Sequence, residues 1–532
     1  LISVLELKDA YQYNQEDRRE NMILLVSPRI DGMKTPQAAL GIGYIASYLE
    51  NNGIACDVMN LSYEAITVDE FIHHTISRGY RVVGFTLKDT SQMDFVCSVA
   101  LKLKEKGIII IAGGYLPTLS YKFLLKNYPF IDYVIRGEAE QSMLYFAKHL
   151  DSDNRYNCPG LSYIKDAEII GNEIPRPIDD LSNLPYPKRP YINVLLKNRL
   201  SINMVSSRGC VNNCSFCAVS AFYRVCTGRN YWRALPPAAL YEEMMHYHRN
   251  YGVIHFNFVD NNFFGNFEKT KSRAIEFADL LIKKRTKFKY RAPLRSDNVD
   301  EKTIETLSRS GLTQVFIGIE SVVPRQLDYY NKRITPQQNH HAIKILNKYN
   351  IDSQIAIIWF DRNTTIEEIR ANLEFTKNIN PHNIHHFPNS MLHVIPQTSL
   401  QKKVTNEAYI QYDAERNAYN YKIKDPIVRQ LYKACNSWVK KYYQLYQLLI
   451  RLRFDCWNQD EGFCNTSKGL YSQLKQAELD FFEDLVVNGS DEYEKKIEAN
   501  TQDFKELLSK GLCLYDKVVD KAGPLYVDFR IK

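Results

Sequence analysis

The first part of the chain alternates short apolar runs with amphipathic segments. Candidate strands are the apolar runs at residues 22–27, 54–61, 81–87, 108–114 and 133–140. Between them, apolar residues recur at helical spacing over 36–53, 68–79, 91–107, 121–129 and 141–150. Strands that alternate with helices predict a doubly wound parallel sheet, which binds ligands at the carboxyl ends of its strands. We therefore expect a Rossmann-like α/β domain over residues 22–150, after a polar tail at 1–21.

A second alternating series begins near residue 202, after a segment at 151–200 that is rich in Asn and Pro. That segment is expected to be a linker, with two short strand candidates inside 160–171. The candidate strands of the second series lie at 202–207, 253–260, 289–293, 314–320, 353–360 and 385–396. Six such units predict a partial (β/α)6 TIM-type barrel over 201–400, with its chemistry at the carboxyl ends of the strands.

From about residue 401 to 532 the pattern is helical and rich in aromatic residues, as in the segment 438–457. Aromatic side chains at helical spacing are usually core. The alternative is that some of them close the mouth of the barrel over a substrate. We expect a third, helical domain here. The complete fold class is thus α/β, with a Rossmann-like sheet, a partial barrel and C-terminal helices.

Composition narrows the class of protein. The 532 residues are 45% hydrophobic and 24% charged, which is ordinary for a globular protein. Sixty-eight Lys and Arg against 61 Asp and Glu leave a net charge of +7, without the clustered excess of a nucleic-acid binder, so we expect no such partner. No run approaches the ~20 apolar residues of a membrane span, and residues 1–20 show no export signal. Eleven scattered Cys argue against a disulfide framework and predict a reducing, cytoplasmic setting.

Three of these cysteines are the centre of the chemistry. Cys210, Cys214 and Cys217 have C-x3-C-x2-C spacing, just after a candidate strand. Three thiolates on one short loop can hold three irons of a [4Fe–4S] cluster, which normally takes four Cys. The fourth iron is then open to a small molecule, and Phe216 would shield the cluster from water. A zinc site that adds Cys226 is the alternative, although the two C-x2-C pairs typical of zinc are absent.

The cysteine loop, placed after the first strand of a six-unit barrel, resembles that of the radical S-adenosylmethionine (SAM) superfamily. The resemblance implies that the open iron chelates SAM and that one-electron reduction cleaves SAM to a 5′-deoxyadenosyl radical. Segments 254–266 and 315–321 look like the second and fourth strands of that superfamily. The SAM contacts that it implies are Phe216, Asp260, Asn261, Asn262, Glu320 and Ser321. The fifth-strand segment departs from the family pattern, because Trp359 and Phe360 stand where Gly is usual.

The first domain has a signature of its own. "AGGYLPT" (112–118) and "VIRGEAE" (134–140) each follow a candidate strand, and glycines there let the backbone approach a bulky ligand. Together, directly upstream of the cysteine loop, they resemble the cobalamin-binding domain of cobalamin-dependent radical SAM enzymes. The implied cobalamin contacts are Ser27, Pro28, Arg29, Asp31, Thr86, Leu87, Gly113, Gly114, Tyr115, Gly137 and Glu138. The alternative is a sheet that no longer binds cobalamin and only packs on the barrel.

The loop 27–41 contains no His, so no imidazole from this loop can ligate cobalt. A cobalt without a strong lower ligand favours methyl transfer, because the axial donor tunes the metal. The resemblance then implies a C-methyltransferase of class B type. One SAM methylates cob(I)alamin, a second yields the radical that removes hydrogen from an unactivated carbon, and that carbon takes the methyl group. The cofactors are a [4Fe–4S] cluster, SAM and cobalamin.

The sequence leaves other interpretations open. The same cofactors support non-methylating rearrangement or oxidative cyclisation in relatives. A non-catalytic iron–sulfur or cobalamin sensor is a hypothesis of another class. The expected partners are a small-molecule or peptide substrate and an external electron donor of reductase, flavodoxin or ferredoxin type. The residues name neither the substrate nor a catalytic acid or base.

Overall fold

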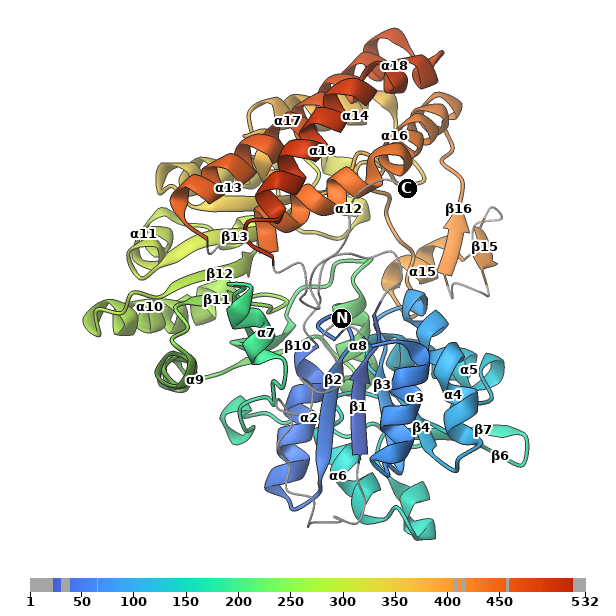
Figure 1. Cartoon of the computed structure of the whole chain (residues 1–532). Helices are drawn as coiled ribbons and strands as arrows, with labels where there is room; N and C mark the ends of the chain where they lie inside the picture. The colour runs from blue at the N-terminus through green and yellow to red at the C-terminus, as the bar shows by residue number, and fades with distance from the viewer. Residues whose placement is uncertain are drawn as a thin grey trace.

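The computed structural model describes residues 23–29, 39–64, 66–405, 410–413, 418–455 and 459–519. Figure 1 shows three parts along the chain: a sheet domain drawn in blue, a barrel in green and yellow, and helices in orange and red. The barrel lies between the other two, which places one face of it against the sheet domain and another against the helices. The fold class that the sequence predicts is confirmed.

The first domain is a seven-stranded sheet in the order β2-β1-β3-β4-β5-β6-β7. Its strands are β1 (Ile23–Ser27), β2 (Cys56–Asn60), β3 (Val82–Thr86), β4 (Ile109–Gly113), β5 (Tyr133–Ile135), β6 (Leu161–Lys165) and β7 (Glu168–Gly171). The helices are α2 (Leu40–Asn51), α3 (Val68–Ser77), α4 (Met93–Lys104), α5 (Tyr115–Asn127) and α6 (Glu140–Lys148). Strands β1 to β5 are parallel and mostly buried on both faces, as expected of a doubly wound sheet.

The sheet continues past residue 150, where we expected the linker to begin. Strand β6 pairs antiparallel with β5, with Val134 opposite Ser162, and β7 pairs antiparallel with β6. These are the two short strand candidates of residues 160–171. An antiparallel hairpin can join a parallel sheet at its edge without a helical crossover, which explains why the alternating pattern stops before the sheet does.

The barrel contributes a five-stranded parallel sheet in the order β14-β13-β12-β11-β8. The strands are β8 (Ile202–Met204), β11 (His255–Phe258), β12 (Lys289–Leu294), β13 (Leu312–Glu320) and β14 (Asp352–Ile357). The helices are α7 (Ile192–Lys197), α9 (Pro237–Tyr251), α10 (Phe267–Lys283), α11 (Glu301–Arg309), α12 (Pro324–Tyr329), α13 (Pro336–Lys348) and α14 (Ile366–Lys377). The sixth expected strand, 385–396, forms no regular ladder. Isolated bridges join Ile384 to Ile355 and Met391 to Phe360, and Pro388 and Pro396 supply no N–H to a ladder.

A small antiparallel pair is inserted between the first two barrel strands. It consists of β9 (Ser207–Cys210) and β10 (Tyr231–Ala234), with α8 (Ala218–Thr227) between them. The single strand expected at 202–207 is broken at Ser206, whose backbone N–H donates to the Asp260 carboxylate over 2.8 Å. The break turns the chain out of the barrel, and the cysteine loop follows from β9.

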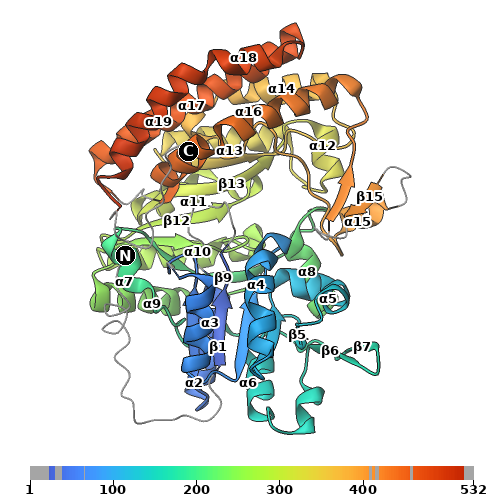
Figure 2. The same cartoon turned by 45° about the vertical axis from the view of Figure 1, so that its right-hand side comes forward.

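The C-terminal part is helical and lies across the barrel (Figure 2). Its elements are α15 (Ser399–Val404), β15 (Ile410–Asp413), β16 (Ala418–Tyr421), α16 (Pro426–Ile450), the π-helical turn η6 (Arg451–Asp455), α17 (Glu461–Asn488), α18 (Tyr493–Ala499) and α19 (Thr501–Tyr515). The β15–β16 hairpin was not expected from the sequence. No described helix combines the length and the continuous hydrophobicity that a membrane span requires.

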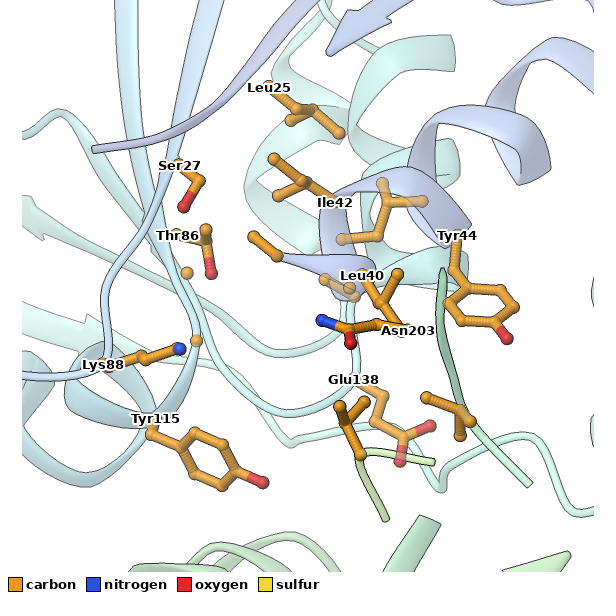
Figure 3. A pocket seen from close by; sticks show the side chains of 18 of the residues that line it. Leu25, Ser27, Leu40, Ile42, Tyr44, Thr86, Lys88, Tyr115, Glu138 and Asn203 are labelled. Atoms are coloured by element: carbon orange, nitrogen blue, oxygen red, sulfur yellow. The ribbon is translucent and has the colours of Figure 1, made fainter. Parts of the chain in front are cut away.

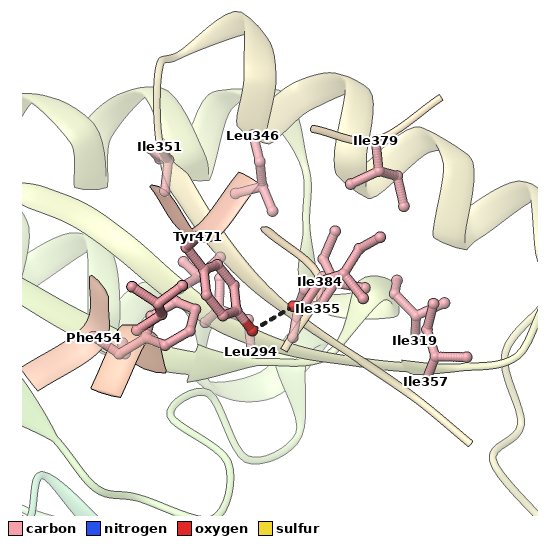
Figure 4. Close-up of a cluster of buried hydrophobic side chains, with 14 of the residues drawn as sticks. Leu294, Ile319, Leu346, Ile351, Ile355, Ile357, Ile379, Ile384, Phe454 and Tyr471 are labelled. Carbon is pink, nitrogen blue, oxygen red and sulfur yellow. Dashed lines mark hydrogen bonds between the residues drawn. The ribbon is translucent and has the colours of Figure 1, made fainter. Parts of the chain in front are cut away.

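Aromatic side chains fasten these helices to the barrel. Phe454 and Tyr471 insert among the buried isoleucines of β13 and β14, and the Tyr471 hydroxyl donates to the Ile384 carbonyl over 2.9 Å (Figure 4). Trp438 of α16 is fully buried and stacks on Phe481 of α17, with 4.3 Å between ring centroids. These aromatic side chains of α16, η6 and α17 are therefore core, as the helical spacing predicted.

Candidate active site

The cysteine loop is held in place by two segments that come later in the chain. Cys210 ends β9, Cys217 stands at the N-cap of α8, and Cys214 is buried between them. The Ser215 N–H donates to the Tyr330 carbonyl over 2.7 Å, and the Ser215 carbonyl accepts from the Leu400 N–H over 2.7 Å. The loop conformation is thus fixed by backbone hydrogen bonds from the barrel and from α15.

Hydrogen-bond donors point at two of the three sulfurs. The Asn212 N–H lies 3.4 Å from Cys210 Sγ, and Arg295 Nη1 lies 3.7 Å from Cys214 Sγ. The Arg295 guanidinium is itself fixed by the Asp297 carboxylate at 2.9 and 3.0 Å. Donors of this kind stabilise thiolates and tune the clusters that thiolates hold. Burial raises the pKa of the Cys217 thiol. Iron would bind the thiolate form, so iron binding would offset the free-energy cost of burying that charge.

The donor set fits a polynuclear cluster better than a single ion. Within the described ranges, no three Cys, His, Asp or Glu side chains converge closely enough to hold one metal ion. A [4Fe–4S] cluster needs no such convergence, because each thiolate takes a different iron. Cys226 lies in an apolar cluster with Phe222 and Tyr223. It is therefore poorly placed to serve as the fourth ligand of the zinc alternative.

The three polar residues after β11 have different surroundings. Asp260 is buried, and its carboxylate accepts from the Ser206 N–H at 2.8 Å and the Ser207 hydroxyl at 3.0 Å. The Asn262 side chain donates to the Gly265 carbonyl over 3.1 Å and lies 4.0 Å from Cys210 Sγ. Asn261 lines a cavity. Asn261 thus has access to a ligand, whereas Asp260 and Asn262 shape the loop. Their role as SAM contacts stays a prediction.

The end of β13 presents a carboxylate to the cysteine loop side of the barrel. Glu320 has φ +63° at a break in the β13–β14 register, and its carboxylate pairs with Lys332 Nζ at 2.8 Å. Glu320 and Phe216 line the same large cavity. The Ser321 hydroxyl is instead buried in hydrogen bonds with Gln326 and Asn372, so only Glu320 of this predicted pair faces open space.

The departure from the family pattern at the fifth strand has a structural counterpart. Trp359 and Phe360 are fully buried. Their rings lie 4.9 and 6.0 Å from that of Phe482 in α17, and Phe360 also contacts Tyr432 of α16 at 5.2 Å. These two aromatic side chains therefore anchor the C-terminal helices to the barrel.

A cavity of about 590 Å³ lies where the first sheet faces the barrel. Figure 3 shows Ser27 and Thr86 at the strand ends, Leu40 and Tyr44 on α2, and Asn203 from β8 around this space. The predicted cobalamin contacts that line it are Ser27, Thr86, Leu87, Gly113, Gly114, Tyr115, Gly137 and Glu138. Pro28 and Arg29 are not among its lining residues, and the Pro28 carbonyl accepts from Gln92 Nε2 over 3.1 Å. Asp31 lies outside the described residues.

Two glycines of this cavity cannot be replaced without a clash. Gly114 has φ +107°, and a Cβ there would lie 2.7 Å from the Leu87 carbonyl oxygen. Gly137 has φ +86°, and a Cβ there would lie 2.7 Å from Ile174 Cγ2. Glycine is therefore required at both positions, because the backbone lies close to neighbouring segments of the protein where the two motifs line the cavity.

Several lining residues were missed by the sequence reasoning because they come from other elements. They are Leu40, Tyr44, Lys88, Gln92, Asn203, Arg208, Asn257, Arg291 and Phe454. Only Lys88 and Gln92 could have been predicted from the sequence. They follow β3, and Thr86 and Leu87 at its carboxyl end were already predicted to contact cobalamin. Leu40 and Tyr44 lie on α2 of the sheet domain itself, and Phe454 lies on η6 of the C-terminal part. The other four reach the cavity through the packing of the barrel on the sheet domain, which no local motif encodes.

Glu138 joins the two domains. Its carboxylate accepts from Arg208 Nη1 at 2.9 Å, from the Tyr223 hydroxyl at 2.8 Å and from Arg233. Burial alone would raise the pKa of Glu138, but Arg208 and Arg233 outweigh it and hold the pKa below its ordinary value. The carboxylate is therefore charged, and it belongs to an ion network between the sheet domain and the cysteine loop.

A second cavity, of about 1870 Å³, lies between the cysteine loop, the barrel strand ends and the C-terminal part. Its lining includes Phe216, Ala218, Glu320, Ile358, His385, His386, His393, Tyr419, Tyr421 and Tyr432. Lys88 and Tyr115 line both cavities. Burial, helped by the nearby Cys217 thiol, raises the pKa of Tyr115 to about 12 against the effect of a hydrogen bond with Asn261. Tyr115 therefore stands as a neutral phenol on the boundary between the two spaces.

Comparisons with known proteins agree with this arrangement. A model of the B12 binding domain matches residues 33–146, and a model of the radical SAM superfamily matches residues 204–376. An uncharacterized methyltransferase of Pyrococcus horikoshii, PH0819, is 28% identical over 374 residues, which are 67% of this chain and 78% of that protein. The anaerobic magnesium-protoporphyrin IX monomethyl ester cyclase of Synechocystis is 26% identical over 53% of this chain. The chain spans about half the length of that cyclase, 55%.

Solved structures share the fold. The cobalamin-dependent SAM radical enzyme OxsB, with aqua-cobalamin and SAM bound, aligns over 96% of this chain and 84% of its own with a TM-score of 0.76 at 16% identity. The radical SAM methyltransferase TsrM of Kitasatospora setae aligns over 73% of this chain and 76% of its own with a TM-score of 0.60, also at 16% identity. Together with the family models, the thiolate loop and the glycine-lined cavity, these findings identify the chain as a member of the cobalamin-dependent radical SAM enzymes, which use a [4Fe–4S] cluster, SAM and cobalamin.

Proposed function

We propose that the protein methylates an unactivated carbon of a small molecule or peptide. The observation that carries the proposal is that the cobalamin-type cavity and the cavity beside the cysteine loop share Lys88 and Tyr115 as a common wall. When bound, the cluster with SAM supplies a 5′-deoxyadenosyl radical, and cobalamin supplies the methyl group. A substrate bound at this boundary would adjoin both cavities.

The residues of the protein would hold and orient the cofactors and the substrate. Cys210, Cys214 and Cys217 would ligate three irons, and the backbone bonds of Ser215 keep the loop rigid. Glu320, paired with Lys332, offers a polar group in the cavity beside the cysteine loop. Asn261 lines the other cavity and hydrogen-bonds with Tyr115 at the boundary. These groups would suit the amino, carboxylate and ribose groups of SAM. Arg295 fixes the environment of Cys214. Positioning of this kind can account for much of the barrier lowering in a reaction between bound partners.

The sheet domain would hold cobalamin by shape. Gly114 and Gly137 let the backbone approach the corrin, and Ser27 and Thr86 offer hydroxyl groups at the strand ends. The described wall of this cavity contains no His. This described wall would therefore offer cobalamin no imidazole ligand, which suits methyl transfer.

The C-terminal part would close the substrate cavity. Tyr419, Tyr421 and Tyr432 of the C-terminal part line this cavity, and the Tyr421 hydroxyl donates to the Leu392 carbonyl over 2.6 Å. Aromatic walls exclude water, which protects a carbon radical from side reactions. The cavity is about twice as large as the upper end of the range for drug-sized ligands, ~1000 Å³. We therefore propose a large substrate, with the electron supplied by an external protein.

Methyl-labelled SAM tests the proposal. The reconstituted, reduced protein is incubated with labelled SAM and an extract of small molecules and peptides, and mass spectrometry follows the label. Methyl transfer predicts a labelled product that appears together with 5′-deoxyadenosine. Formation of 5′-deoxyadenosine with every product unlabelled would refute methyl transfer while leaving the cofactor assignment intact.

Oxidative cyclisation is the second candidate, because the cyclases of Synechocystis and Rubrivivax gelatinosus are 26% and 28% identical to this chain. The same incubation separates the two candidates. A cyclase predicts a product that has lost hydrogen and carries no label. A non-catalytic sensor predicts no 5′-deoxyadenosine beyond that formed without protein.

A further inference from the structure

The cysteine loop reaches the molecular surface at one place. Val211, directly after Cys210, is 38% exposed, whereas Cys214 and Ser215 are buried. The Asn230 side chain holds this stretch from one side by donating to the Val211 carbonyl over 3.1 Å. The Asn331 side chain holds it from the other by donating to the Asn213 carbonyl over 2.6 Å. Residues 211–213 therefore lie at the surface directly beside the cysteine ligands.

Cationic side chains surround this exposed stretch. Arg224 of α8 donates to the Asn213 side chain, and Arg333 donates to the Asn331 side chain over 3.2 Å. Arg229 is exposed and precedes Asn230. We call these three residues together with Lys403 the cationic rim.

The fourth member of the rim comes from the C-terminal part. Lys403 of α15 lies over the ring of Tyr329, with 5.7 Å from Nζ to the centroid, and the Tyr329 carbonyl accepts from the Ser215 hydroxyl over 3.0 Å. Figure 2 shows α8, α12 and α15 on the same side of the molecule. Asp328 of α12 is also exposed and brings a carboxylate close to Tyr329.

We infer that the cationic rim is the docking surface for an acidic one-electron carrier protein, of flavodoxin or ferredoxin type. The inference rests on the proposed function, because only a cluster that must be reduced needs an electron. Charge complementarity steers such a partner to the surface and raises its association rate by factors of 10 to 10³. One electron then passes from the carrier, which is oxidised, to the cluster, which is reduced, and no bond forms or breaks in this step.

The position of the cationic rim favours an electron-carrier protein over other partners. The exposed Val211 and Val225, 38% and 37% exposed, give the rim an apolar centre, which protein interfaces typically have. Arg224 of the rim contacts Asn213 within the Cys210–Cys214 segment, whereas none of the four rim residues lines either cavity. An electron entering here would meet the cluster without crossing the substrate.

The test is the rate of cluster reduction in the full-length, reconstituted protein, followed by stopped-flow absorbance without air. The variant is the double charge reversal Arg229→Glu and Lys403→Glu, because no described contact of these two side chains holds a cysteine. The matched control reverses Arg309 and Lys505, which are exposed on α11 and α19. Each protein is mixed with reduced flavodoxin and, separately, with reduced methyl viologen, a small cation.

We expect the rim variant to be reduced by flavodoxin at least tenfold more slowly than the wild type and the control. Methyl viologen should reduce the rim variant at least as fast as the wild type. Added salt should lower the rate at which flavodoxin reduces the wild type, toward the rate of the rim variant. Equal flavodoxin rates in the variant and the control would overturn the inference. So would an equal loss of rate with both reductants, or no flavodoxin reduction of the wild type. A cluster that methyl viologen cannot reduce in the wild type would refute the proposed function instead.

Discussion

Arg208 Nη1 lies 2.9 Å from Glu138 Oε2, and this pair links the walls of two cofactor sites. Glu138 follows Gly137 in the cobalamin-type cavity, and Arg208 stands two residues before Cys210. Both side chains are almost fully buried. A second carboxylate, Glu140, also accepts from Arg208 Nη1, at 2.8 Å. The spacing between the cobalamin-type cavity and the cysteine loop is therefore held by a buried ion network.

Removing the charge of Glu138 should weaken this junction. For Glu138→Gln we expect a loss of about 3 kcal/mol in the free energy of unfolding at pH 7, because Arg208 and Arg233 are left buried and underpaired. The folded-state pKa of Glu138 is lowered. Its stabilisation is therefore fully present above the unfolded value of about 4.3 and is lost as the pH falls through the folded value.

Urea titration at pH 7 and at pH 4 measures this difference. Glu242→Gln is the control, because Glu242 forms a surface pair with Arg249 at 3.4 Å and should cost less than about 1 kcal/mol. The account predicts that the gap between the two variants narrows at the lower pH. Equal stability of the two variants at pH 7 would show that the junction does not depend on Glu138.

A second buried carboxylate should respond to pH in the opposite sense. Burial raises the pKa of Glu243 to about 7, against a smaller opposite effect of Arg189, and its Oε1 atom has no hydrogen-bond partner within the described structure. The unfolded chain releases this proton more readily than the folded one. The protein therefore loses stability as the pH rises from about 4.5 to 7, by about 3 kcal/mol.

Glu243→Gln removes this titration, so its free energy of unfolding should vary less with pH. We expect the variant to match the wild type near pH 5 and to exceed it by about 3 kcal/mol at pH 8. Thermal or urea unfolding over this range measures both profiles. Parallel profiles of the two proteins would contradict a raised pKa at Glu243.

Gly114, directly after β4, should be needed for cobalamin binding and not for cluster binding. Gly114→Ala places a Cβ 2.7 Å from the Leu87 carbonyl oxygen in a backbone with φ +107°. Gly107→Ala is the matched control, since Gly107 has φ +75° in open space in the same domain. We expect Gly114→Ala to lose most of its bound corrin, measured by the visible spectrum, with its iron content unchanged. Equal corrin content in the two variants would place cobalamin elsewhere.

Arg295 should raise the reduction potential of the cluster. A hydrogen bond from a charged donor stabilises the more negative, reduced state, and such bonds are worth about 1.5–3 kcal/mol. Arg295→Gln should therefore lower the midpoint potential in a redox titration followed by electron paramagnetic resonance, with iron content as the control. Arg295→Lys keeps the charge and should recover part of the shift. An unchanged potential in Arg295→Gln would show that the 3.7 Å contact with Cys214 has no electronic effect.

Local sequence patterns predicted most helices, strands and motifs. Features that depend on tertiary contacts could not be predicted from the sequence. The apolar runs at 22–27 and 108–114 became β1 and β4 because a buried parallel strand needs little besides local hydrophobicity. The Gly-Gly and cysteine motifs located two candidate sites in the sequence, since backbone geometry and ligand type are local properties. The individual cofactor contacts stay predictions. Asp260 could not be predicted as a structural residue, because its partners Ser206 and Ser207 are about fifty positions away.

The contacts between domains were out of reach for the same reason. The pairing of Glu138 with Arg208 spans 70 residues, and Arg295 reaches Cys214 across 81. The prediction of a sixth strand at 385–396 was wrong, although the apolar pattern there is typical of a strand. The segment contains two prolines, and the effect of their missing N–H groups on strand pairing depends on which strand lies beside them.

The central claim is that three thiolates hold a cluster that cleaves SAM beside a separate corrin site. The most direct measurement compares the iron, corrin and 5′-deoxyadenosine of wild-type and Cys214→Ala protein, both prepared and reduced without air. The account predicts about four irons and one corrin per wild-type chain, with Cys214→Ala keeping its corrin but losing the cluster and SAM cleavage. A Cys214→Ala protein that retains its full iron content and still forms 5′-deoxyadenosine would contradict the account.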